Sequence, residues 1–321
     1  MKCLITGGLG FIGSNLARRL VHEGHSVTLV DSLIPSYGGN LANIRDILNR
    51  VTVNISDIRD PYATRALLHG VDIVFNLAGQ TSHADSMSNP FPDLDINAKA
   101  QLSLLEAIRE VNPGVIVIFA STRQLYGKPQ YLPVDESHPI RPVDVNGVNK
   151  LAGEQFHLLY HDVYGVRACA LRLTNTYGPG MRIKDARQTF LGIWIKQLLT
   201  KDSIQVFGDG TQLRDFNFVD DVVDALISAA TTESCYGKVL NLGGSEVISL
   251  KDLAVKLTRL SPDSSWRIVP FPEERKKIDI GDYYSDFGLA TDLLGWCPQV
   301  KLDEGLLKTV HYYRQNLSDY T

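Results

Sequence analysis

The chain has 321 residues and a formal net charge of −4, and 44% of its residues are hydrophobic. This length allows one large domain or two modest ones, with enough apolar residues for a full core. Acidic and basic residues are mixed along the chain. The chain has no basic tract that would indicate a nucleic acid partner. It also has no acidic tail that would act as a solvating arm.

The spacing of the cysteines and the lengths of the apolar runs indicate the cellular compartment of the protein. The four cysteines (Cys3, Cys169, Cys235 and Cys297) are far apart and show no C-x-x-C spacing. We expect free thiols in a reducing compartment and no metal site. No apolar run approaches the roughly 18 residues of a membrane span, and we expect no signal peptide before the first strand. The sequence predicts a cytoplasmic protein without a membrane partner.

The first strand and the glycine-rich turn after it organise the chain. An apolar run over 2–6 predicts a buried strand, and Gly7, Gly10 and Gly13 follow it as G-x-x-G-x-x-G. Such a turn lets backbone approach a pyrophosphate at the N-terminus of the next helix. The alternative is a glycine-rich turn in some other α/β domain, but the strand before the turn and the helix after it favour a dinucleotide site.

A carboxylate at the end of the second predicted strand indicates which dinucleotide binds. The strand over 26–31 ends at Asp31, which lies 18 residues after Gly13. An acid at about this distance binds the ribose 2′-OH and would repel a 2′-phosphate. We therefore predict NAD rather than NADP.

Strands and helices alternate up to about residue 175. We predict strands at 2–6, 26–31, 50–55, 72–77, 114–120 and 167–173, and helices near 11–23, 40–48, 60–69, 93–112 and 146–164. This alternation predicts an α/β fold with a doubly wound parallel sheet of the Rossmann type. We expect the dinucleotide-binding domain to span 1–175 and a smaller α/β substrate-binding part to span 176–321, with some chain crossing back to the sheet.

With these residues in hand, the chain resembles the extended short-chain dehydrogenase/reductase family. More narrowly, it resembles the NAD-dependent nucleotide-sugar epimerases and dehydratases, the UDP-glucose 4-epimerase type among them. The resemblance covers nearly the whole chain. Its markers are Thr6 to Gly13, Asp57 to Asp60, Asn76 to Gln80, Asn97, Ser121 to Gly127, Lys150 to Glu154, Asn175 to Gly180, and Phe207 to Asp221.

The resemblance implies a role for each matching position. Asp57 and Ile58 would meet the adenine, and Lys150 would bond the nicotinamide ribose. The full implied cofactor set is Gly7, Gly10, Phe11, Ile12, Gly13, Asp31, Ser32, Asp57, Ile58, Leu77, Ala78, Gly79, Asn97 and Lys150. Asn97 is equally compatible with helix packing or capping.

The implied substrate set lies at the ends of later strands and in the C-terminal part. It comprises Gln80, Ser82, Thr122, Arg123, Asn175, Gln188, Thr189, Val206, Arg214 and Asp282. Thr122 matches the catalytic Ser/Thr of the family, while Asn175 and Arg214 match residues that hold the nucleotide diphosphate. In relatives a basic residue precedes a Gly-Asp pair by two positions. Here that position is Asp279, before Gly281-Asp282, and this departure puts the nucleotide in doubt.

The position of the family's catalytic tyrosine, four residues before Lys150, is occupied by Asn146. An amide cannot act as a general base near neutral pH and can only orient by hydrogen bonds. Three interpretations remain: an enzyme whose base is another group, a protein that binds NAD and a sugar with little or no chemistry, or a sensor. For an active enzyme, His83 in the loop expected after the fourth strand is one candidate base. Thr122 with a water, or Tyr126, are others. Thr122, Asn146, Lys150 and His83 form the candidate catalytic set.

Residue types after Thr122 separate the possible reactions. In the 4,6-dehydratases of this family those two residues are Asp and Glu, whereas here they are Arg123 and Gln124. Neither can remove water at neutral pH. We therefore expect a nucleotide-sugar epimerase that acts at C4 of a UDP-hexose. A dehydratase or other oxidoreductase with relocated acid–base residues and a non-catalytic sensor are the alternatives. The apolar stripes near 93–112 and 146–164 imply, through the resemblance, a homodimer.

Overall fold

The computed structural model describes residues 1–187 and 189–321. Its centre is a seven-stranded parallel sheet in the order β10-β6-β5-β4-β1-β2-β3. The strands are β1 (Lys2–Thr6), β2 (Ser26–Asp31), β3 (Thr52–Ile55), β4 (Ile73–Asn76), β5 (Ile116–Thr122), β6 (Arg167–Leu173) and β10 (Val239–Asn241). The order reverses between β1 and β4, as in a doubly wound fold. The predicted fold class is confirmed.

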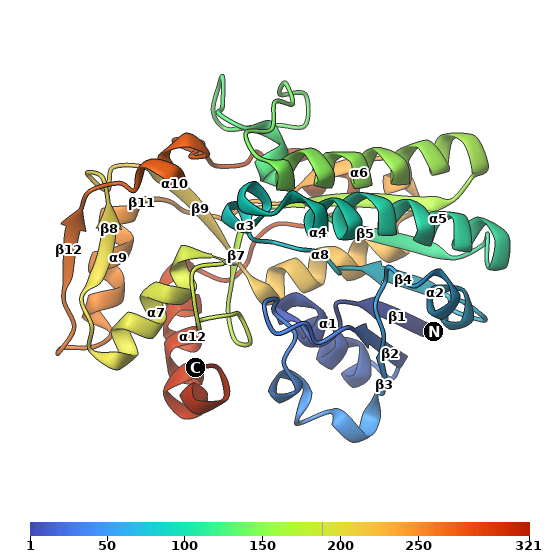
Figure 1. Ribbon diagram of the computed structural model, residues 1–321, viewed down its shortest axis with the longest axis horizontal. Helices are drawn as coiled ribbons and strands as arrows, with labels where there is room; N and C mark the ends of the chain where they lie inside the picture. The colour runs from blue at the N-terminus through green and yellow to red at the C-terminus, as the bar shows by residue number, and fades with distance from the viewer. Residues whose placement is uncertain (188) are drawn as a thin grey trace.

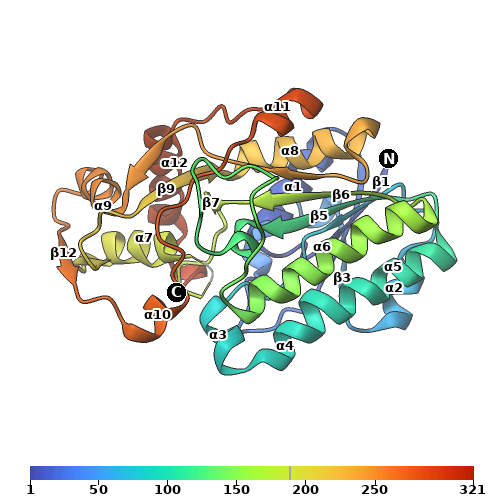
Figure 2. The same cartoon turned by 90° about the horizontal axis from the view of Figure 1, so that it is seen from above.

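Helices cover both faces of this sheet (Figures 1 and 2). One face carries α2 (Pro61–Leu67), α5 (Ala100–Val111) and α6 (Val145–Tyr164), and the other carries α1 (Phe11–His22), α8 (Val219–Thr231) and α11 (Gly288–Leu294). Each layer buries its own apolar cluster: Leu4, Leu105 and Val117 lie in the first, and Leu16, Ile118 and Leu226 in the second. The buried strands are apolar on both faces because both are covered.

The C-terminal part lies beyond the carboxyl ends of these strands, on the left in Figure 1. It holds two small sheets, β11-β9-β7 and β12-β8, made of β7 (Asn175–Tyr177), β8 (Ile204–Phe207), β9 (Leu213–Phe218), β11 (Val247–Ser249) and β12 (Trp266–Val269). Around them lie α7 (Phe190–Thr200), α9 (Leu250–Arg259), α10 (Glu273–Lys277) and α12 (Leu302–Asn316). Strand β10, from beyond residue 176, pairs with β6 in the main sheet. The division at residue 175 stays a prediction.

Three expected elements differ from the structure. The predicted helix over 40–48 is wrong, because the chain forms two short 3₁₀ turns, Leu41–Ile44 and Leu48–Arg50. The helix expected over 93–112 is split into α4 (Pro90–Leu94), a π-helical turn at Asp95–Lys99, and α5. The segment that contains His83 is a short helix, α3 (His83–Ser88), capped by the Ser82 hydroxyl.

Within the described residues, no helix combines the length and the apolar character needed to cross a membrane.

Candidate active site

A cavity of about 620 Å³ lies between the carboxyl ends of the parallel strands and the C-terminal part. Residues that follow β1, β2, β4, β5 and β6 line one wall, and residues of α7, β8, β9 and α10 line the other. Ligands of doubly wound sheets bind at this edge, next to the point where the strand order reverses. The fold therefore places the predicted site residues around one cavity.

The N-terminus of α1 opens onto this cavity. Its N-cap is Gly10, which has no side chain to bond the helix, so the first N–H groups stay free. Phe11, Ile12 and Gly13 all line the cavity. A Cβ on Gly13 would lie 2.3 Å from the carbonyl oxygen of Gly7, whose φ is +68°. The loop is thus tight enough to place backbone donors against an anion such as a pyrophosphate.

Asp31 fixes the same loop from the end of β2. Its Oδ2 accepts a hydrogen bond from the Leu9 N–H at 3.2 Å, and its Oδ1 accepts one from the Leu33 N–H at 2.9 Å. Burial raises the pKa of this carboxyl, and the two backbone donors oppose that rise. Because Asp31 also lines the cavity, its carboxylate is placed to accept from a ribose hydroxyl.

Lys150 projects from α6 to the carboxyl end of β5. Its Nζ donates to the carbonyl oxygen of Ala120 at 2.9 Å and lies 4.8 Å from the ring centroid of Phe119. Burial lowers its pKa to about 8, against the opposing effect of Asp93 and Glu154. A Cβ on Gly79 would lie 3.1 Å from this Nζ and 3.0 Å from Oδ1 of Asn97. The bare backbone of Gly79 keeps room beside the ammonium for a cofactor ribose.

Thr122 ends β5 with its hydroxyl at the cavity. The Oγ1 atom accepts a hydrogen bond from the Gln124 N–H at 3.2 Å, so the hydroxyl proton stays free to donate to a substrate oxygen. The Gln124 side chain is buried and donates from Nε2 to Oδ2 of Asp144 at 2.9 Å. Gln124 therefore supports the wall of the site and carries no acid–base function there.

Asn146 is held by two acceptors. Its Nδ2 donates to the carbonyl oxygen of Gln80 and to Oδ2 of Asp93, each at 2.8 Å. Since both partners are acceptors, they fix which end of the amide carries the nitrogen. Asn146 lines the cavity, and Oδ1 is the polar atom it has left to offer. It can accept a hydrogen bond from a sugar hydroxyl, but it cannot take the proton.

His83 and Asp144 meet at the same end of the cavity. Nδ1 of His83 lies 3.0 Å from Oδ2 of Asp144. Nδ1 is buried and makes no hydrogen bond of good geometry with any described residue, so the ring lies against the carboxylate without a hydrogen bond to it. Burial raises the pKa of Asp144, but His83 and the Gly147 N–H outweigh it, and the net pKa is lowered. The carboxylate stays ionised beside the imidazole, whose other nitrogen, Nε2, has no hydrogen-bond partner among the described residues.

Two arginines face the middle of the cavity. Arg123 Nη2 donates to Oδ1 of Asn175 at 2.9 Å, and Arg214 lies 3.5 Å from Oδ1 of Asp279. Burial and, to a smaller extent, repulsion from Arg123 lower the pKa of Arg214 to about 10, against the attraction of Asp279. These two guanidinium groups place positive charge on this part of the cavity wall.

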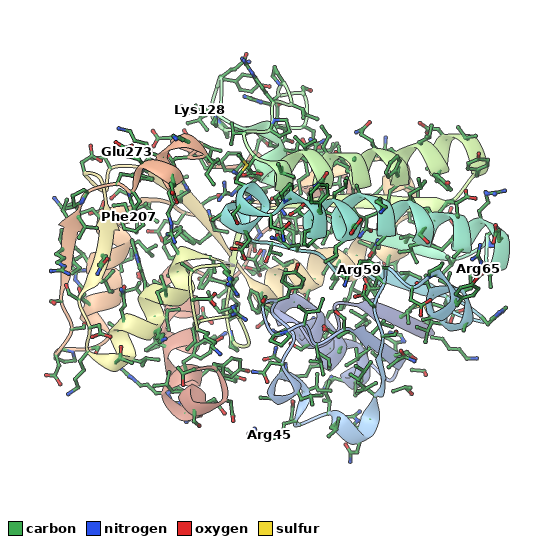
Figure 3. All side chains as sticks on the ribbon, in the orientation of Figure 1. Arg45, Arg59, Arg65, Lys128, Phe207 and Glu273 are labelled. Carbon is green, nitrogen blue, oxygen red and sulfur yellow. The ribbon has the colours of Figure 1, made fainter. Side chains whose placement is uncertain are left out.

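The far end of the cavity is aromatic. The ring centroids of Phe207 and Phe271 lie 5.7 Å apart, and the Arg275 guanidinium lies 5.5 Å from the Phe207 centroid. Figure 3 labels Phe207 on the C-terminal part and Arg59, next to the cavity-lining Asp57, on the side of the parallel sheet. Aromatic and guanidinium faces of this kind suit a flat base.

Comparison with known proteins agrees with this arrangement. Residues 3–243 match the model of the NAD dependent epimerase/dehydratase family. The chain belongs to this family. It is 31% identical over 314 residues to a putative UDP-glucose 4-epimerase of Methanocaldococcus jannaschii, covering 98% of each chain.

Solved structures of family members have the same fold. The UDP-glucose 4-epimerase of Thermotoga maritima, solved with UDP-glucose, superposes with a TM-score of 0.90 at 31% identity, covering 99% of this chain and 100% of that one. The UDP-glucuronic acid 4-epimerase of Bacillus cereus, solved with UDP-glucuronic acid and NAD, gives 0.87 at 30% identity, covering 98% and 100%. The free N–H groups of α1, Asp31 and the space at Gly79 fit NAD, which is the cofactor of this family.

Most residues that the sequence predicts for the site line the cavity. Of the cofactor set these are Gly7, Gly10, Phe11, Ile12, Gly13, Asp31, Ser32, Asp57, Ile58, Leu77, Ala78, Gly79 and Lys150. Of the substrate and catalytic sets they are Gln80, Ser82, His83, Thr122, Arg123, Asn146, Asn175, Thr189 and Arg214. Gln188 lies outside the described residues.

Three of the predicted residues lie elsewhere. Asn97 is fully buried. Its Oδ1 accepts a hydrogen bond from the Gln80 N–H, and its Nδ2 donates to the Gln80 carbonyl oxygen. Val206 is a core residue of β8, while its neighbours Gln205 and Phe207 line the cavity. Asp282 accepts from the Leu213 N–H at 2.8 Å. These side chains hold the walls of the site.

Tyr126 is unsuited to act as the base that the sequence leaves open. It is fully buried, donates to Oδ1 of Asn241 and accepts from Arg172. Burial raises its pKa to about 12. Its hydroxyl is thus occupied within the core and away from the cavity.

Sequence reasoning missed Asp144 and Asp93. Both are buried acids that hold cavity-lining side chains, and each is far in sequence from at least one of its partners. The position of Asp144 just before the predicted helix at 146–164 is a capping signal. No local pattern, however, connects it with His83.

Proposed function

We propose that this chain is an NAD-dependent nucleotide-sugar epimerase that acts at C4 of a UDP-hexose through a transient keto-sugar. One observation carries the proposal: a single cavity joins the cofactor cradle at α1 and Lys150 to Thr122 and His83. Residues that elimination of water would need are replaced by Arg123 and Gln124. Hydride chemistry at one carbon therefore suits the site better than elimination does.

His83 serves as the general base in this proposal. Nδ1 lies against Asp144, so Nε2 is the ring atom that takes the proton of the sugar hydroxyl. Imidazoles titrate in the range in which a base must work near neutral pH. The proton returns from the same nitrogen when the keto group is reduced again.

The other polar residues position the sugar. Thr122 donates its hydroxyl proton to the reacting oxygen, and Asn146 Oδ1 accepts from a sugar hydroxyl. Lys150, through its ammonium group, bonds the cofactor ribose and stabilises negative charge that develops nearby. Bound NAD would accept the hydride from C4 and later return it to the opposite face of the sugar.

Asn146 also supports a second candidate, a protein that binds NAD and a nucleotide sugar without turnover. Its Nδ2 is committed to Gln80 and Asp93, and its remaining oxygen is not basic. If His83 does not replace the tyrosine, binding remains while hydride transfer does not occur.

The experiment that separates the two candidates follows the cofactor directly. The NAD-loaded protein is mixed with UDP-, CDP-, GDP- and dTDP-sugars while the absorbance of reduced nicotinamide is recorded, and the sugar product is then analysed by NMR. We expect one UDP-sugar to give a C4 epimer. Binding without reduction or product across the panel would support the non-catalytic candidate.

The role of His83 is tested by two variants. We expect His83→Gln to lower kcat by about 10²–10⁴-fold, the usual contribution of a general base. Asp144→Asn should lower kcat less and move the acid limb of the pH–rate profile, because the carboxylate only orients the imidazole. The control is His22→Gln, at an exposed histidine at the end of α1, which should leave kcat unchanged. Unchanged kcat in His83→Gln would exclude His83 as the base.

A further inference from the structure

Arg123 is a cation that the chain itself leaves incompletely paired. Its Nη2 bonds Asn175, but its Nη1 is buried and has no hydrogen-bond partner among the described residues. Its guanidinium carbon lies 5.0 Å from the centroid of Tyr283, a fully buried ring. The side chain is therefore held in place by stacking and by one neutral amide.

No carboxylate within the described part of the chain comes within ion-pair distance of Arg123. Burial lowers the pKa of this guanidinium, although Tyr283, Asp215, Asp279 and Asp144 oppose that effect from further away. A buried guanidinium nitrogen without an acceptor is costly. Arg123 lines the cavity, so a bound anion is the partner that would satisfy it.

The position of Arg123 indicates which part of a ligand it meets. It directly follows Thr122 at the end of β5, three residues after Ala120, whose carbonyl holds Lys150. The aromatic pair Phe207 and Phe271 lies on the C-terminal wall instead. Arg123 therefore lies between Thr122, at the reacting end of the cavity, and Arg214, whose charge it repels, so a sugar bound at Thr122 would come next to it.

The diphosphate has other cations available. Arg214 lines the cavity on the side of the C-terminal part, where its charge can meet a diphosphate, and Arg275 stacks on Phe207 further along the same wall. A neutral hexose beside Arg123 would leave Nη1 with at most a hydroxyl acceptor. A carboxylate on the sugar would accept from the guanidinium and neutralise it, which is the stronger type of hydrogen bond.

We propose that Arg123 binds a carboxylate carried by the sugar, so that the substrate is a nucleotide-activated uronic acid. This inference rests on the proposed function insofar as the ligand is a nucleotide sugar. It names the substrate class of that site. Arg123 thereby acts as the residue that selects acidic over neutral sugars.

Binding is measured by calorimetry on the NAD-loaded protein with UDP-glucuronic acid, UDP-galacturonic acid, UDP-glucose and UDP. The variants are Arg123→Gln, which keeps donors without charge, and Arg123→Lys, which keeps the charge. Arg275→Gln, an arginine on the opposite wall, is the matched comparison. A melting temperature for each variant shows whether it folds.

We expect the native protein to bind at least one uronic acid at least 10-fold more tightly than UDP-glucose. Arg123→Gln should lower the affinity for that UDP-linked uronic acid about 10- to 100-fold, which is the range of a charge-assisted hydrogen bond. It should leave UDP and UDP-glucose nearly unchanged. Arg123→Lys should restore part of the preference, and Arg275→Gln should weaken all ligands alike.

Three results would overturn the inference. The first is an equal loss for UDP and all UDP-sugars in Arg123→Gln, which would place Arg123 on the diphosphate. The second is a native protein without preference for either uronic acid, a result that stands even if the variants do not fold. The third is an unchanged preference in Arg123→Gln. Because these readouts need no turnover, failure of the proposed epimerisation would leave the binding test intact.

Discussion

The side-chain nitrogen of Asn146 donates to Oδ2 of Asp93 at 2.8 Å, and this contact ties α6 to α4 beneath the cavity. Asp93 is fully buried and also accepts from Asn149 at 2.8 Å. The residue at the position of the family's tyrosine is thus part of a closed polar network. It is part of the cavity wall.

Asn146→Asp should destabilise the protein strongly at neutral pH. The new carboxylate would face Asp93 without a donor between them, and two buried carboxylates cannot both stay ionised at this distance. Because the folded state then holds a carboxyl with a raised pKa, the loss is absent below the unfolded pKa, grows as the pH rises above it, and is largest above the raised folded pKa. We expect a cost of roughly 2–4 kcal/mol at pH 7, by the penalty for an unpaired buried charge.

Urea unfolding between pH 5 and 8 checks this prediction. The control is Asn49→Asp, at an exposed position in the 3₁₀ turn Leu48–Arg50, which should unfold like the native protein at every pH. A cost that does not change with pH would mean that the contact between residues 146 and 93 is not electrostatic in the way described.

Local patterns predicted the main sheet well and short elements poorly. The first six expected strands agree with the structure to within two residues at each end, because buried parallel strands are continuous apolar runs bounded by turns. The helix predicted over 40–48 does not form. The buried Ile44 ends the first 3₁₀ turn, and the buried Ile47 caps the second. Helix α3 buries little beyond Ser86, so it leaves no apolar periodicity in the sequence.

The pairing between site residues could not be predicted from spacing. His83 and Asp144 are brought together by α3 packing on α6, and the tie between Asn146 and Asp93 depends on the packing of α4. The resemblance placed single residues at the cavity, since motif positions follow strand ends. Contacts between side chains of different βαβ crossovers can be identified only from the packing of the helices in the structure.

Gly79→Ala should remove NAD without unfolding the protein. Its Cβ would lie 3.0 Å from Oδ1 of Asn97 and 3.1 Å from Nζ of Lys150, so it would fill the space beside the ammonium. We expect the affinity for NAD to fall at least about 10-fold, since a loss of 1.4 kcal/mol of binding already has that effect, and the NAD content of the purified protein to fall with it. The content is read by absorbance after denaturation.

Gly114→Ala is the matched control for this variant, because a Cβ there meets no atom within 4 Å. It should retain the native NAD content and melting temperature. Equal NAD content in both variants would show that the space at Gly79 is not used by the cofactor.

The buried ammonium of Lys150 should make the stability of the cofactor-free protein depend on pH. Burial lowers its pKa to about 8 from 10.5, so between these values the folded state binds fewer protons than the unfolded state. The unfolding free energy of the native protein, relative to Lys150→Met, should therefore rise from pH 8 to 10.5 by roughly 1–3 kcal/mol. Below pH 8 the cost of burying the charge is present in full. Urea unfolding of both proteins measures the difference, and Lys128→Met, at an exposed lysine (Figure 3), should show no such trend.

The outer face of α6 should bind a second copy of the chain. Val148, Leu159 and Val163 on this helix are 54%, 51% and 60% exposed, and apolar side chains gathered on one helix face indicate an interface. We expect the native protein to sediment at twice its chain mass of 35.6 kDa. The pair Leu159→Glu and Val163→Glu should shift it to the monomer, because two buried carboxylates per copy oppose association. Leu307→Glu, at an equally exposed leucine of α12, should leave the dimer intact. A native monomer at micromolar concentration, or a dimer that persists with both glutamates, would place the contact elsewhere or exclude it.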